Sequence, residues 1–314
     1  MAKIRLQNFP RLPSIAAAIC AALVMTGCDS TDEEPVPSTD QAQQRTNIGI
    51  SLGAPGLISG IDPAHVSGAE IDLAVALSQQ LDIINSAEDV TWVPITGSQS
   101  ATVSEADELD ITVGQFTGAS LDEDMAWVGP YLNVEAGLLV RSGSTAEDET
   151  SPDYLATKTI RSMDDLDDAA VCVVADSLAD SAASPLEHHT TQQTVTACET
   201  GLRSGRYDAI AADDVQLAGL LESSATPEAY EIVGWSDMAA DSDEELSDQF
   251  QTSGQYWIGT TPQHCDAAAA ALQQVLTDGV VEEHLSQWND DLDYTPDYVE
   301  ADEVTTQHCN TKTS

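Results

Sequence analysis

Apolar and polar residues alternate along the chain in two patterns, one typical of helices and one of strands. Residues 69–81 predict an amphipathic helix, with one broad apolar face made by Ile71, Ala74, Val75, Leu77 and Leu81. Short apolar runs bounded by Gly, Pro, Asp or Ser predict strands. These runs lie at residues 47–53, 90–95, 111–116, 137–140, 170–174, 208–212, 230–234 and 255–260. Further helices are predicted at 265–276 and 280–288. Strands that alternate with helices indicate an α/β fold.

The central stretch, residues 110–141, combines several of these features. It contains the strand at 111–116, an acidic loop, a turn predicted at Gly129-Pro130-Tyr131, and the strand that leads to Arg141. This order resembles the centre of the bacterial family 3 extracellular solute-binding proteins, which serve amino-acid ABC transporters. Residues 48–57 and 67–81 resemble that family's opening strand, ligand loop and first helix, and residues 201–221 resemble its second lobe. The resemblance covers roughly Thr46 to Trp288 and points to the actinobacterial glutamate/glutamine-binding type.

The resemblance implies a two-lobed, periplasmic-binding-protein-like (type II) α/β fold with two crossing hinge strands. We expect these strands near residues 137–141 and 255–260. The first lobe is expected at 46–141 with a return part at 255–288, and the second lobe at 142–254. Residues 289–314 form an acidic C-terminal tail in which no apolar periodicity predicts an element.

The N-terminal 27 residues have the pattern of a signal peptide. Lys3, Arg5 and Arg11 precede an apolar run from Ile15 to Met25, which is too short to span a bilayer. Met-Thr-Gly-Cys at 25–28 resembles a lipoprotein cleavage box, so we expect lipidation of Cys28; ordinary cleavage beside an incidental cysteine is the alternative. Residues 28–45 are polar and rich in Asp, Glu, Ser and Pro, which predicts a disordered tether. The protein is therefore expected outside the cytoplasm, held at the cell membrane by its N-terminal lipid.

Charge narrows the range of partners. The 314-residue chain is 42% hydrophobic and 20% charged, which is typical of globular proteins, but 54 acidic residues face only 10 basic ones. A surface this acidic repels phosphates, so nucleic acid is excluded as a partner, and we expect membrane contact through the lipid alone. Solubility of a secreted protein and adaptation to high salt both account for the acidity.

Four cysteines remain after Cys20 and Cys28, namely Cys172, Cys198, Cys265 and Cys309. An even number in an oxidising compartment implies two disulfides, and the sequence alone permits three pairings. The resemblance to actinobacterial members of the family favours Cys172 with Cys198, which leaves Cys265 with Cys309. No Cys-x-x-Cys spacing exists, and the adjacent residues Glu187-His188-His189 point apart on a helix or strand, so we expect no metal or cofactor.

The ligand site departs from what the resemblance implies. A family member binds an α-carboxylate with an arginine on the loop after the third strand, and an α-ammonium with an aspartate in the second lobe. Asp213 matches that aspartate, while its neighbour Asp214 is also a good helix cap. Between Arg45 and Arg141 the chain has no arginine, and Asp122 stands in the loop where one is expected.

These residues favour a cationic or neutral solute, because a desolvated carboxylate would meet like charges. Asp213 and Asp122 would hold it, with Phe116 or Trp127 stacking against it. By position in the family pattern, further ligand contacts are expected at Thr117, Ser177 and Leu57.

The predicted function is therefore that of a binding module and not an enzyme. A monomer would capture a small polar solute, an amino acid or a similar molecule, by hinge closure and deliver it to an ABC permease. A sensor or signalling lipoprotein with a degenerate pocket and a membrane signalling partner is the alternative. Dehydratase chemistry by Asp213 with Asp122 is a third hypothesis, and it again lacks an arginine for a substrate carboxylate.

Overall fold

The computed structural model describes the chain in several segments. These are residues 45–95, 109–118, 121, 125–142, 160–183, 186–240, 252–288, 292 and 294–309. The predicted signal peptide, Cys28 and the tether up to residue 44 lie outside the described residues, as does Asp122. Within the described residues, no helix is both long enough and apolar enough to cross a membrane.

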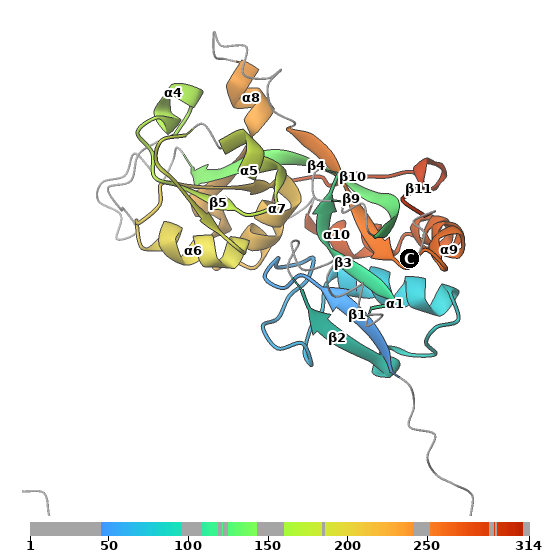
Figure 1. Cartoon of the computed structure of the whole chain (residues 1–314). Coiled ribbons are helices and arrows are strands. Elements are labelled where there is room, and N and C mark those ends of the chain that lie inside the picture. The colour runs from blue at the N-terminus through green and yellow to red at the C-terminus, as the bar shows by residue number, and fades with distance from the viewer. Residues whose placement is uncertain are drawn as a thin grey trace, which may run out of the picture. The chain divides into compact units, whose positions relative to one another are not determined.

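The first lobe is built on a mixed sheet. Its strands are β1 Thr46–Ile50, β2 Val90–Pro94, β3 Ile111–Thr117, β9 Ser253–Thr260 and the first part of β4 Ala126–Arg141. β1 pairs in parallel with β2 and β3, whereas β9 lies antiparallel between β3 and β4. Helices α1 Ala69–Gln80 and α9 Cys265–Thr277 pack against the sheet, and α10 Val280–Leu285 packs against these two helices (Figure 1). A short turn of helix, η1 Ala87–Asp89, leads into β2.

The second lobe has its own sheet, which continues from the last part of β4. Its strands are β5 Val171–Val174, β6 His189–Gln192, β7 Ala209–Asp213 and β8 Tyr230–Gly234. β5 is parallel to both β6 and β7, while β7 and β8 are antiparallel to β4. The helices of this lobe are α4 Met163–Leu166, α5 Leu178–Ala183, α6 Val195–Arg203, α7 Asp214–Glu222 and α8 Trp235–Ala240, with the short turn η3 Pro227–Ala229 before β8.

Strand β4 crosses from one lobe to the other. Residues up to Glu135 pair with β9, and from Ala136 onward the same strand pairs with β7 and β8. Residues 137–141, which the sequence analysis placed in the first lobe as a hinge strand, therefore lie inside the second sheet. The strand passes from one sheet to the other just before these residues, at Glu135-Ala136.

The turn predicted at Gly129-Pro130-Tyr131 is wrong. These residues lie inside β4, with a cis peptide bond between Gly129 and Pro130 and a shift of register against β9 between Val128 and Leu132. Proline lacks a backbone N–H and is accepted in a strand at such an irregularity. Pairing with neighbouring strands thus overrides the local preference of Gly-Pro for a turn.

The C-terminal segment is ordered onto the first lobe, although its sequence predicts no element. Strands β10 Asp297–Tyr298 and β11 Thr305–Gln307, with the turn η4 Ala301–Glu303 between them, pair antiparallel with β4. A disulfide joins Cys309 to Cys265 at the start of α9, with Cα atoms 5.8 Å apart. The other disulfide joins Cys172 of β5 to Cys198 of α6, with Cα atoms 5.6 Å apart. These are the two pairs that the sequence analysis favoured.

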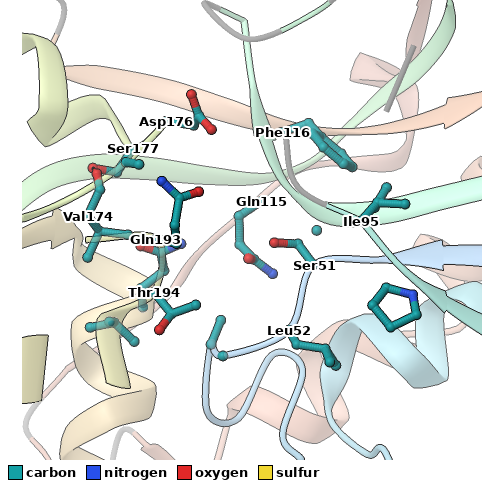
Figure 2. A pocket seen from close by; sticks show the side chains of 17 residues that line it. Ser51, Leu52, Ile95, Gln115, Phe116, Val174, Asp176, Ser177, Gln193 and Thr194 are labelled. Carbon is teal, nitrogen blue, oxygen red and sulfur yellow. The ribbon is translucent and has the colours of Figure 1, made fainter. Parts of the chain in front are cut away.

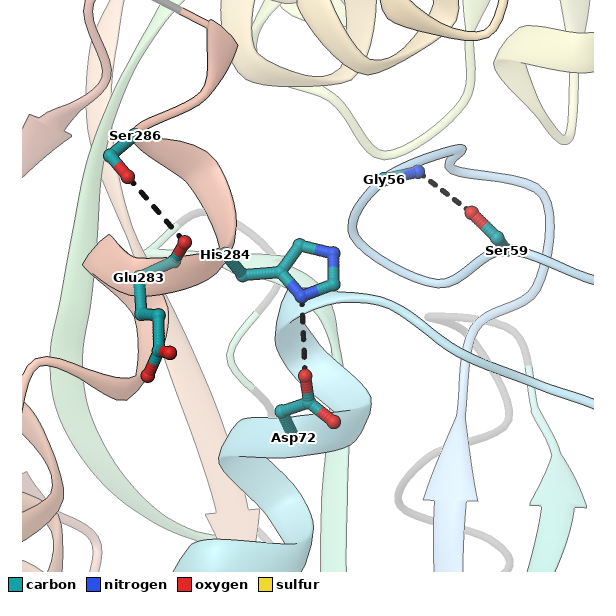
Figure 3. A network of polar contacts seen from close by, with 6 residues as sticks. All are labelled: Gly56, Ser59, Asp72, Glu283, His284 and Ser286. Carbon is teal, nitrogen blue, oxygen red and sulfur yellow. Dashed lines mark hydrogen bonds and ion pairs between the residues drawn. The ribbon is translucent and has the colours of Figure 1, made fainter.

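Helix α1 packs its apolar face into the main core, where Ile71, Leu73, Ala74 and Leu77 are buried. On its other side it contacts α10, and His284 Nδ1 lies 3.2 Å from Asp72 Oδ2 (Figure 3). The loop before α1 is closed by a short hydrogen bond, in which Gly56 N–H donates to Ser59 Oγ at 2.8 Å (Figure 3). The first contact links α1 to α10, and the second lies within the loop between β1 and α1.

We predict that the C-terminal segment contributes to folding stability. A chain that ends at Trp288 loses the strand pairing with β4 and the Cys265–Cys309 disulfide, and removing such a disulfide alone typically costs about 2–5 kcal/mol. Denaturant unfolding measures the loss, and the Cys265→Ala, Cys309→Ala double variant separates the disulfide from the strands. Unchanged stability of the shortened chain would show that the segment is a passive tail.

Candidate functional site

A cavity of about 230 Å³ lies between the two lobes (Figure 2). From the first lobe it is lined by residues 51–54, 94–95 and 114–116. From the second lobe it is lined by residues 174–177 and 193–195 and by Gln216 of α7. Most of these positions follow the carboxyl end of a parallel strand, which is where open α/β sheets bind their ligands.

The lining of this cavity is polar but carries few charges. Asp176 is the ionisable residue among the lining residues, and the neutral polar ones are Ser51, Gln115, Ser177, Gln193, Thr194 and Gln216. Gln216 is 6% exposed, and its Oε1 has no hydrogen-bond partner among the described residues. A buried acceptor without a partner costs about 1–3 kcal/mol, which a donor on a bound molecule would offset. The cavity is therefore suited to a molecule rich in N–H or O–H donors.

The apolar side of the cavity includes Ile95 and Phe116 (Figure 2). Phe116 is buried, and its ring packs against Trp127 with centroids 5.3 Å apart and planes at 59°. Trp127 is fully buried and is not part of the lining, so of the two aromatic residues considered for stacking only Phe116 faces the cavity. Trp127 supports it from behind.

The residues predicted to bind a ligand fall into three groups. Phe116 and Ser177 line the cavity, although the Ser177 hydroxyl already donates to the Val174 carbonyl at 2.7 Å. Thr117, Leu57 and Asp213 are buried and do not line it, so their predicted ligand contacts stay predictions. Asp122 lies outside the described residues, so its predicted role stays a prediction.

Asp213 does not line the cavity, and its carboxyl oxygens are hydrogen-bonded within the protein. Tyr256 of β9 donates its hydroxyl to Asp213 Oδ2 at 2.7 Å, and the Leu178 backbone N–H donates to Oδ1 at 2.8 Å. Burial raises the pKa of Asp213 to about 7, even though both hydrogen bonds act in the opposite direction. Because Tyr256 belongs to the first lobe and Asp213 to the second, this carboxyl group joins the lobes.

Asp214 has a related role beside it. Its carboxylate accepts from the Glu135 backbone N–H at 2.9 Å and from the Tyr294 hydroxyl at 2.8 Å. Burial raises the pKa of Asp214 as well. Asp214 is the first residue of α7 and not its N-cap, which is Asp213; its carboxylate ties the start of α7 to the crossing point of β4 and to the C-terminal segment.

Glu70 is a buried acid that the sequence analysis missed. It lies on α1 with an exposed fraction of 1%, accepting from Gln115 Nε2 at 2.6 Å and from the Tyr131 hydroxyl at 2.7 Å. Burial raises the pKa of Glu70 to about 7. The sequence does indicate that Glu70 is buried, because residue 70 shares a helical face with the buried Ala74 and Leu77.

The two lobes also touch at the edge of the cavity. A Cβ atom added to Gly53 would lie 2.6 Å from the Thr194 Cγ2 atom, and one added to Gly219 of α7 would overlap the Pro55 carbonyl oxygen. Gly53 has a φ of 97°, which also favours glycine. Glycine at these positions lets the loop after β1 approach the second lobe closely.

Comparison with solved structures identifies this fold. The chain resembles the solute receptor for L-cysteine of Neisseria gonorrhoeae, with a TM-score of 0.58 and 15% identity over 78% of this chain and 89% of that one. It also resembles the cysteine-binding protein of Campylobacter jejuni, with a TM-score of 0.59 and 15% identity over 83% and 95%. A substrate-binding protein of an ABC uptake transporter from Streptococcus pneumoniae, with bound histidine, gives 0.57 and 18% over 79% and 93%.

These likenesses establish the two-lobed, periplasmic-binding-protein-like α/β fold. No protein-family model matches the sequence, and no curated protein matches it by sequence. In the described part of the chain, no group of three or more His, Cys, Asp or Glu side chains is placed to hold a metal ion.

We predict that Asp213 makes stability depend on pH. Its pKa rises from 3.8 to about 7 on folding, so the folded state favours the protonated acid, and stability falls as the pH rises from about 4 to 7. Relative to Asp213→Asn, the wild-type free energy of unfolding should fall by roughly 2–3 kcal/mol between pH 5 and pH 8. Denaturant unfolding of both proteins across this range, at one salt concentration, measures the difference. Parallel pH profiles would contradict the assignment.

A second prediction concerns the contact between the lobes. Gly219→Ala should favour α7 by helix propensity, yet its methyl group would meet the Pro55 carbonyl oxygen and hold the lobes apart. Small-angle X-ray scattering should therefore give a larger radius of gyration for this variant. Gly118→Ala is the matched control, because nothing lies within 4 Å of a Cβ atom added there. Equal radii for Gly219→Ala and wild type would show that the contact does not set closure.

Proposed function

We propose that this protein is an extracytoplasmic solute-binding lipoprotein, which captures a small polar solute between its lobes and delivers it to an ABC permease. The observation that carries the proposal is the cavity of about 230 Å³, which takes its lining from both lobes. A solute in that position contacts both walls at once, so its binding energy favours the closed arrangement over an open one. Proteins of the same fold are described as binding cysteine or histidine.

The chemistry of the lining narrows the class of solute. Asp176 supplies negative charge, and Gln216 supplies an acceptor without a partner among the described residues. A protonated amine or another donor-rich solute satisfies both groups, whereas a carboxylate would approach Asp176 without a described cation to balance it. We therefore propose a cationic or neutral molecule of amino-acid size, and not glutamate.

The route to the membrane is the lipid on Cys28, with residues 29–45 as the tether. This part of the proposal rests on the sequence pattern around the Met-Thr-Gly-Cys box. A tethered monomer stays close to its permease, so capture and delivery take place at one membrane surface.

A sensor or signalling lipoprotein is the second candidate. It is favoured by Asp213, because the residue that matches the ammonium-binding position of the family is committed to Tyr256 and Leu178. Such a protein would keep the two-lobed fold while its cleft binds weakly or serves another partner.

A thermal-shift panel of amino acids, polyamines and betaines separates these two functions. For a transport protein, Tm rises with ligand concentration for at least one amine, by the energy that binding adds to the folded state. Ala175→Trp, which fills the cavity wall, should abolish the shift, whereas Ala64→Trp on the exposed surface should leave it unchanged. No shift across the panel favours the sensor, and a shift that survives Ala175→Trp would place the ligand elsewhere.

A further inference from the structure

Gln115 occupies an unusual position at the end of β3. It is the residue after Gly114 in a stretch where the register between β3 and β9 shifts, between Thr112 and Phe116. Its φ is 60°, a left-handed conformation that is uncommon for residues other than glycine. Irregular strand positions of this kind redirect a side chain, and strained ones persist where the surroundings hold them. Here the result is that Gln115 lines the cavity between the lobes (Figure 2).

The surrounding group that holds Gln115 is Glu70. Gln115 Nε2 donates to Glu70 Oε2 at 2.6 Å, while Glu70 Oε1 accepts from the Tyr131 hydroxyl at 2.7 Å. Tyr131 itself packs near Tyr256, with ring centroids 5.9 Å apart. Both carboxyl oxygens of Glu70 are therefore engaged by donors, and Glu70 is too deeply buried to touch a molecule in the cavity.

We infer that Glu70 is a specificity-determining residue, which acts through Gln115 and never contacts the ligand. Because one N–H of the Gln115 amide donates to Glu70, the orientation of the amide is fixed, and its oxygen is left to accept a hydrogen bond from a ligand. The cavity therefore favours a donor at this oxygen over a carboxylate oxygen. This inference rests on the proposed solute-binding function, and it assigns one element of the selectivity to a residue on α1.

The variant Glu70→Gln tests this assignment because it preserves shape while adding a donor. Its amide can keep accepting from Tyr131 and donate to Gln115, which can then turn its own amide and present its nitrogen to the cavity. Asp213→Asn is the matched control. It replaces the other acid that is fully buried among the described residues, whose hydrogen bonds go to Tyr256 and Leu178 and do not involve Gln115.

The first measurement needs no ligand. In ¹⁵N-labelled protein, the side-chain amide resonance of Gln115 is identified by its displacement in Gln115→Asn, a variant that tolerates a positive φ. We expect slow exchange of this amide with solvent in the wild type and in Asp213→Asn, and exchange faster by about tenfold in Glu70→Gln, the factor for one lost hydrogen bond. Rapid exchange in the wild type, or no change in Glu70→Gln, would overturn the inference.

The second measurement uses two compounds of equal size, 4-aminobutanamide and 4-aminobutanoate, in calorimetric titrations. The wild type and Asp213→Asn should prefer the amide, and Glu70→Gln should lose about tenfold of that preference. An unchanged ratio of dissociation constants in Glu70→Gln would also overturn the inference.

If neither compound binds the wild type, the proposed class of solute fails, while the amide exchange still decides whether Glu70 holds Gln115. If Glu70→Gln does not fold, loss of the preference in Gln115→Asn supports the inference, and its retention refutes it.

Discussion

A buried hydrogen bond between Tyr256 and Asp213 joins the two lobes and keeps the Asp213 carboxyl group out of the cavity between them. Tyr256 lies on β9 of the first lobe, and Asp213 ends β7 of the second. Removing a carboxylate from water is costly unless donors replace the water, and here the Tyr256 hydroxyl and the Leu178 backbone N–H do so. These two hydrogen bonds offset the cost of burial only in part, so the pKa of Asp213 lies above its usual value. The neighbouring Asp214 fastens the same junction to Glu135 and Tyr294.

Our proposed function gives Asp213 no direct contact with the ligand. At the position where the family resemblance implies an ammonium-binding aspartate, the carboxyl group serves the protein's own junction. On our proposal, Asp176 and the amides of Gln115 and Gln216 take over recognition from the cavity wall. The side chains in this wall accept hydrogen bonds, so the proposed solute is a donor without a carboxylate. Such a solute needs no arginine in the loop after β3, and the sequence of that loop has none.

Much of the fold could be predicted because its elements carry strong local patterns. The run Val171–Val174 is apolar throughout, as a buried parallel strand requires, and helix α1 shows a continuous apolar face. The crossing strand β4 was missed in part, because Gly129-Pro130 has a local preference for a turn that pairing with β9 and β11 overrides. Strands β10 and β11 are too short to show a period, and their pairing is supplied by β4.

The site was harder to predict than the fold. The family pattern places Phe116 and Ser177 beside the cleft, and both lie in the cavity wall, although their contact with a ligand stays a prediction. Glu70 and Asp213 were not predicted as buried, because their donors Tyr131 and Tyr256 lie 61 and 43 residues away in the sequence. A helical or strand pattern reports which face is covered, but it does not report which distant side chain satisfies a carboxyl group there.

Calorimetric titration of the best-bound amine into Asp176→Asn and Asp213→Asn tests the central claim most directly, since the two variants make the same Asp-to-Asn change in the cavity wall and at the lobe junction. The account predicts that Asp176→Asn weakens binding by at least about tenfold, as expected for a charged hydrogen bond, and that Asp213→Asn binds nearly as the wild type does. The opposite result, with binding lost in Asp213→Asn and kept in Asp176→Asn, would contradict it.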